Sequence, residues 1–135
     1  MILLDTDVIL DVALDRAPWA DDAAALLTRL EAGPIGCFVA WHTLSNLYYL
    51  LRPVRGGRDA RDFLVGLTAF ATVVPTGTED FRFAVQLPVP DLEDAMQAAA
   101  AHACGARWIA TRNVRDFERS PVPARSPADL LAELA

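Results

Sequence analysis

Short apolar runs alternate along the chain with longer segments in which apolar residues recur at helical spacing. The runs are too short for helices and are typical of strands buried on both faces of a parallel sheet. We predict five strands, at residues 1–4, 35–40, 72–75, 107–111 and 122–125.

The segments between these runs predict helices, and several have recognisable ends. Pro53 closes one helix, Gly105 ends the alanine-rich one, and Ser126 is an N-cap. Helices are predicted at residues 7–14, 19–33, 41–52, 58–71, 79–87, 91–104 and 127–134. This alternation predicts one domain over residues 1–135, an α/β fold. We expect a three-layer α/β/α sandwich with a mostly parallel central sheet of four to five strands.

Composition adds an expectation about surfaces and location. The chain is 53% hydrophobic, yet no apolar run approaches the roughly 18 residues that span a bilayer. No secretory signal is visible, so we expect a cytoplasmic protein whose surplus apolar surface meets a subunit or partner. A net charge of −6 argues against a protein that coats nucleic acid, and all twelve basic side chains are arginines.

Carboxylates follow the ends of predicted strands and begin the alanine-rich helix. Asp5 and Asp7 follow the first strand, Asp116 follows the fourth, and Asp91 and Asp94 open the helix. Each acid alone has a simpler explanation as a helix cap or turn residue. Together they predict one acidic rim at the carboxyl ends of the strands, where such sheets bind ligands. Carboxylates brought this close must hold a cation or raise one pKa, and oxygen ligands favour Mg²⁺ or Mn²⁺.

Four segments resemble the successive landmarks of PIN domains, in particular the VapC-type toxins of bacterial type II toxin–antitoxin pairs. They are "ILLDTDVILD", "TLSNLYYLLR", "DLEDAMQAAAAHACGARWIATRNVRDF" and "SPADLLAEL". The resemblance implies a PIN-like parallel sheet, an acidic metal site and Mg²⁺- or Mn²⁺-dependent RNA cleavage by metal-activated water. It also implies a homodimer that a small antitoxin neutralises.

The resemblance implies roles for individual residues. Asp5, Asp94 and Asp116 match the family's metal-binding, catalytic acids, and Thr111 and Asn113 match a polar pair that orients the metal and its waters.

One position departs from the family pattern. Asn46 stands where the helix after the second strand normally carries a glutamate. An asparagine offers only a neutral oxygen, so the site loses one negative charge. Asp91, Glu93 and Asp7 are candidates to compensate, and one-metal hydrolysis survives with few carboxylates.

Arginines close to the acidic residues are candidate RNA contacts. Arg112 and Arg115 flank the cluster, and the segment 52–61 adds four arginines, among them Arg55 and Arg58. Solvated surface arginines are an equally good interpretation for each.

The helix predicted at 41–52 is apolar nearly all round, so one face fills the core and another meets a partner. His42, on this helix, has no partner at ligand spacing and is expected to be a surface or boundary residue.

Two rival functions remain open. Haloacid-dehalogenase-like phosphatases also begin with a strand and D-x-D, but they need a lysine, which this chain lacks. The stronger rival is a PIN-fold module that Asn46 has deprived of catalysis and that binds RNA or an antitoxin.

Overall fold

The computed structural model describes all 135 residues, and its centre is a sheet of five short strands. The strands are β1 (Ile2–Leu4), β2 (Cys37–Val39), β3 (Ala71–Val73), β4 (Trp108–Ala110) and β5 (Ala124–Arg125). Their order is β3-β2-β1-β4-β5, and every neighbouring pair is parallel. The predicted parallel α/β sheet is therefore confirmed.

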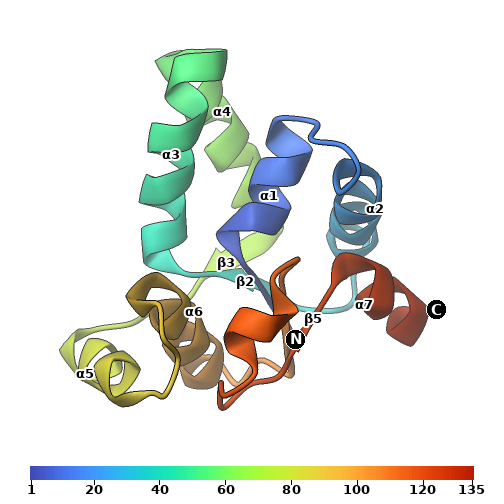
Figure 1. The fold of residues 1–135 in the computed structure, drawn as a ribbon. Helices are drawn as coiled ribbons and strands as arrows, with labels where there is room; N and C mark the ends of the chain where they lie inside the picture. The colour runs from blue at the N-terminus through green and yellow to red at the C-terminus, as the bar shows by residue number, and fades with distance from the viewer.

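Seven α-helices and one short 3₁₀-helix, η1, connect and follow the strands (Figure 1). They are α1 (Thr6–Ala13), α2 (Ala20–Glu31), α3 (Trp41–Arg55), α4 (Gly57–Leu67), α5 (Thr78–Gln86), α6 (Leu92–Ala103), η1 (Val114–Phe117) and α7 (Pro127–Leu134). Figure 1 shows α1, α3 and α4 on one side of the sheet and α5 and α6 on the other. No helix combines the length and the apolar character that a membrane span requires.

The three layers follow from the alternation of side chains along the strands. Ile2 and Leu4 belong to the larger core, together with residues of α1, α2, α3, α4 and α7. Leu3 and Ile109 point the other way, into a core built mainly with the alanines of α6. Alanines allow α6 to approach the sheet closely, which places the first turn of this helix beside the end of β1.

The strand order determines where a ligand site belongs. Strands are added from β1 through β2 to β3 on one side, and then β4 lies on the opposite side of β1. The reversal between β1 and β4 is the topological switch point, where α/β sheets leave a crevice beyond the carboxyl ends of the strands. Asp5 and Thr111 each follow directly after one of these two strands.

Most predicted ranges differ from the structure by a few residues at their ends, and three differences change the description of the fold. Helix α3 continues through Pro53 to Arg55, because a proline so close to the helix end removes only one backbone hydrogen bond. Helix α4 ends at Leu67 instead of residue 71, and Ala71 instead begins β3. The 3₁₀-helix η1 has no apolar periodicity long enough to predict it.

Candidate metal centre

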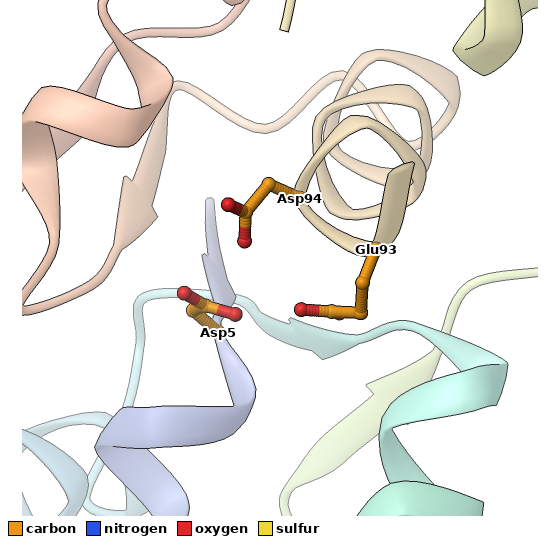
Figure 2. A group of neighbouring side chains, drawn as sticks. All are labelled: Asp5, Glu93 and Asp94. Carbon is orange, nitrogen blue, oxygen red and sulfur yellow. The ribbon is translucent and has the colours of Figure 1, made fainter. Parts of the chain in front are cut away.

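Three carboxylates gather beyond the carboxyl end of β1 (Figure 2). Asp5 is the N-cap of α1, and Glu93 and Asp94 lie in the first turn of α6. One oxygen from each side chain lies within 4.8 Å of the others. The three carboxylates point toward one another although they come from segments nearly ninety residues apart in the sequence.

Both oxygens of Asp5 are held by protein donors. Its Oδ1 accepts from the backbone N–H of Thr6 at 2.8 Å, and its Oδ2 accepts from Thr111 Oγ1, also at 2.8 Å. The Thr111 hydroxyl in turn accepts from the backbone N–H of Asn113 at 3.0 Å. Asp5 is only 4% exposed, so these bonds fix its orientation inside the protein.

Asp7 lies beside this group and is only partly satisfied. Asn113 Nδ2 donates to Asp7 Oδ2 at 2.8 Å, whereas Asp7 Oδ1 is buried without a hydrogen-bond partner. A buried carboxylate oxygen without a partner is costly, and it suits a site in which a cation or its water supplies the missing contact. The predicted polar pair Thr111 and Asn113 thus contacts two acids at the site.

Glu93 is held from two helices. His42 Nε2, on α3, lies 2.7 Å from Glu93 Oε2, and Gln97 Nε2 donates to the same oxygen at 2.9 Å. Neither of these two partners of Glu93 was predicted from the sequence. The spacing of Glu93 and Gln97, four residues apart on one helix, was a signal that could have indicated the second contact.

Burial and mutual repulsion raise the pKa values of these acids. Burial, followed by the charge of Asp7, raises the pKa of Asp5 to about 8. Burial and the neighbouring charges, Glu93 foremost, raise the pKa of Asp94 to about 7. Burial also raises the pKa of Asp7 to about 6, although the charge of Arg112 opposes the shift. The site therefore holds more negative charge than its surroundings stabilise, which is the condition for binding a cation.

Two further predicted acids, Asp116 and Asp91, also lie outside the group of three. Asp116 is exposed on η1, because this helix turns Phe117 into the core and leaves its neighbour outside. Its charge still contributes to the raised pKa of Asp94, so it faces the same side of the molecule. Asp91 is the N-cap of α6 and accepts from the backbone N–H of Asp94 at 3.0 Å.

Asn46 lies on the side of α3 that faces the site. It is half-buried and follows His42 by four residues and Thr43 by three, which are the spacings of one helix face. His42 contacts Glu93, and Thr43 accepts from Gln97 at 2.7 Å. Asn46 itself is not a member of the carboxylate group.

Of the two arginines next to the site, one makes contacts within the protein and the other is exposed. Arg112 pairs with the buried Asp11 at 3.1 Å, and its guanidinium lies 4.0 Å from the centre of the Trp19 ring. Arg115 is exposed on η1. Arg112 therefore ties the loop after β4 to α1 and is not a free cation at the surface.

The segment 52–61 ends α3 and begins α4, away from the carboxylates. Arg55 pairs with Asp59 at 2.9 Å. Arg58 instead lines a cleft of about 370 Å³ together with Tyr48 and Arg61.

The donor set fits a hard divalent cation. All three side chains of the group offer carboxylate oxygens, and neither a cysteine nor a histidine is among them. Mg²⁺ and Mn²⁺ prefer such ligands, whereas zinc sites draw on histidine and cysteine. The raised pKa values of Asp5 and Asp94 and the unpartnered oxygen of Asp7 are further properties that a bound cation would relieve.

Comparison with known proteins identifies the family. The model of the PIN domain family matches residues 1–115. No curated protein sequence matches the chain.

Three similar solved structures share the fold at low sequence identity. The VapBC2 complex of Rickettsia felis, bound to a promoter DNA fragment, matches with a TM-score of 0.73 and 16% identity over 93% of this chain and 98% of the other. DNA-bound VapBC from Salmonella typhimurium matches with a TM-score of 0.71 and 18% identity, over 93% of this chain and 97% of the other. VapC20 of Mycobacterium tuberculosis, a toxin that cleaves the sarcin–ricin loop, matches with a TM-score of 0.65 and 17% identity. This match covers 81% of this chain and 87% of the other. Because the family model covers most of its length, the chain belongs to the PIN domain family, and its fold is that of the VapC toxins.

Proposed function

We propose that the chain is a Mg²⁺- or Mn²⁺-dependent endoribonuclease and the toxin of a type II toxin–antitoxin pair. The observation that carries the proposal is the group formed by Asp5, Glu93 and Asp94 at the switch point of the sheet. Membership of the PIN domain family supports the nuclease activity and removes the phosphatase alternative. The fold shared with VapC20, a toxin described as cleaving the sarcin–ricin loop, supports RNA as the substrate.

Asp5, Glu93 and Asp94 would hold the divalent ion, and Asp116, exposed on η1, would face it from the solvent side. The bound ion would neutralise the carboxylates and activate a water for attack on the phosphodiester. Thr111 keeps the Asp5 carboxylate in place through its 2.8 Å hydrogen bond. Asn113 does the same for Asp7, whose other oxygen is buried and has no partner within the protein.

A basic cleft supports a contact with the RNA backbone. The segment 52–62 has a net charge of +2, whereas the remainder of the chain has −8. Arg58 and Arg61 line the cleft there beside Tyr48 and one acid, Asp62, and arginine pairs bind phosphate oxygens well. Arg115 is a further candidate close to the carboxylates, whereas Arg112 is engaged with Asp11.

Exposed apolar side chains along α3 support partner binding. Trp41 is 70% exposed, Tyr49 64% and Val54 69%, all on α3. Surfaces of this kind mark protein interfaces. Two of the similar solved structures are VapBC complexes, which supports a small antitoxin as one partner. A second copy of the chain is the other partner that we propose for these exposed side chains.

The test is cleavage of total cellular RNA with Mg²⁺ or Mn²⁺. We expect cleavage by the wild type, loss of cleavage with Asp5→Ala or Asp94→Ala, and no change with Asp21→Ala, an exposed acid on α2. Circular dichroism checks that each variant is folded. A wild-type protein that cuts no RNA with either ion would contradict the proposal and favour the module that only binds RNA or an antitoxin.

A further inference from the structure

The third carboxylate of the site comes from α6 and not from α3. Asn46 on α3 is neutral, yet Glu93 on α6 completes the group, and a residue of α3 contacts it. The contact is His42, four residues before Asn46. The two helices therefore meet about one helical turn from the position that an acid on α3 would otherwise occupy.

We propose that Glu93 takes the place of the missing carboxylate of α3 and that His42 and Gln97 are positioning residues that hold it there. The inference rests on the metal centre proposed above and assigns a role to two residues outside the carboxylate group.

Glu93 needs such support because of its surroundings. Its side chain is 39% exposed and has three rotatable bonds, so the carboxylate can turn away from the site into solvent. Asp5 and Asp94 repel its charge, and without a cation this repulsion favours a conformer that points outward. The donors of His42 and Gln97 both reach Oε2, at 2.7 and 2.9 Å, and they retain the carboxylate within the group.

The orientation of the Gln97 amide indicates that Glu93 is its target. Gln97 is fully buried, and its Nε2 lies 2.7 Å from Thr43 Oγ1, 2.9 Å from Glu93 Oε2 and 3.2 Å from Thr6 Oγ1. Its Oε1 has no partner. Hydroxyl groups both donate and accept, so the two threonines tolerate either amide orientation.

A carboxylate only accepts, so it is Glu93 that decides the orientation. In the reversed amide, the Gln97 oxygen would face the Glu93 oxygen, acceptor against acceptor. The structure instead leaves a buried carbonyl oxygen unsatisfied and directs the NH₂ group to Glu93. A core that only needed packing would not require this arrangement, since an apolar side chain of the same size avoids the unpaired oxygen.

Titration calorimetry with Mn²⁺ tests the inference without relying on catalysis. We expect Glu93→Gln to weaken Mn²⁺ binding about 10-fold or more, and His42→Leu and Gln97→Met each to weaken it about 10-fold, as loss of a supporting hydrogen bond does in other metal sites. His42→Gln keeps a donor near the position of Nε2, so we expect it to retain most of the Mn²⁺ affinity that His42→Leu loses. Asn46→Glu, added to Glu93→Gln, is expected to return the missing carboxylate and the affinity with it.

Matched controls separate positioning from general damage. His102→Leu removes the other histidine, which is exposed near the end of α6, and Gln86→Met alters an exposed glutamine on α5. Neither control should change Mn²⁺ affinity. Thermal unfolding in EDTA verifies that each variant is folded.

The outcomes distinguish this inference from the proposed function. If wild type binds no Mn²⁺, the metal centre itself is wrong. If Asp94→Ala abolishes binding but Glu93→Gln does not weaken it, the metal centre stands and the role of Glu93 is overturned. If Glu93→Gln weakens binding while His42→Leu and Gln97→Met do not, the positioning role is overturned.

Discussion

Replacing Asp5 by asparagine should stabilise the metal-free protein while abolishing its metal binding. Asp5 is 4% exposed, and burial together with the charge of Asp7 raises its pKa from 3.8 to about 8. Asparagine has nearly the same shape, still accepts from the backbone N–H of Thr6, and has no charge to bury. The substitution therefore tests whether a carboxylate is kept at this position at the expense of stability.

The magnitude follows from the proton that the folded protein retains. The ordinary pKa of an aspartate lies about 3 units below pH 7, so the unfolded chain has released this proton at pH 7. The folded protein keeps it, because the pKa of Asp5 there is about 8. At roughly 1.4 kcal/mol per pH unit, keeping this proton lowers the free energy of unfolding of the metal-free protein by about 4 kcal/mol. Asparagine avoids this loss but deprives Thr111 of its acceptor, which costs about 1 kcal/mol. The net gain has an upper limit of about 3 kcal/mol, or roughly 6 to 12 °C in Tm.

Thermal unfolding with EDTA and with Mn²⁺ measures both effects. In EDTA at pH 7, Asp5→Asn should unfold at a higher temperature than the wild type. Mn²⁺ should raise the Tm of the wild type, because it binds the folded state, and should leave the variant unchanged. Asp62→Asn, at an exposed position of α4, is the control for a simple change in net charge. A variant in EDTA no more stable than the wild type would refute the reasoning about burial.

Three further predictions concern the same site. Asp5 and Asp94 bind protons more tightly in the folded than in the unfolded state, so metal-free stability should fall as pH rises from about 4 to about 8, and a series of melts in EDTA measures this. Thr111→Val removes the donor that lowers the pKa of Asp5, so it should weaken Mn²⁺ binding in calorimetry and, as a buried hydrogen-bond loss, reduce stability by about 1–2 kcal/mol in urea unfolding. Asn46→Glu in the wild-type background should tighten Mn²⁺ binding, whereas Ser45→Glu, at the exposed neighbouring position, should not; equal affinities for both would show that position 46 does not face the site.

Much of the fold follows from local sequence patterns. Buried strands leave short apolar runs, and the cap at Ser126 is confirmed by its hydrogen bond from the backbone N–H of Asp129 at 3.1 Å. Pro53 misled the prediction because a proline rule cannot tell an early stop from a proline in the last turn. The length of α4 was misjudged because its apolar pattern continues into β3 without a break.

The site was harder to predict than the sheet. Asp5 and Asp94 follow from their places at a strand end and a helix start, and both lie in the carboxylate group. The choice between Glu93 and Asp116 as third member depends on how α6 is rotated against β1 and on the turn of η1. The sequence contains neither angle, and it could only name Glu93 as one of several possible compensating acids.

The carboxylates and the arginines of the molecule lie largely in different places. Arg112, beside the carboxylates, is bound to Asp11 and stacked on Trp19, so it secures the loop that holds Thr111, and its charge offsets only part of the rise in the pKa of Asp7. An RNA phosphate approaching these acids meets repulsion unless a divalent ion is bound. Two of the accessible arginines, Arg58 and Arg61, lie instead at the junction of α3 and α4, where they line one cleft. The proposed nuclease therefore obtains the positive charge at its reaction centre from the metal, and the charge that attracts the RNA backbone from a separate part of its surface.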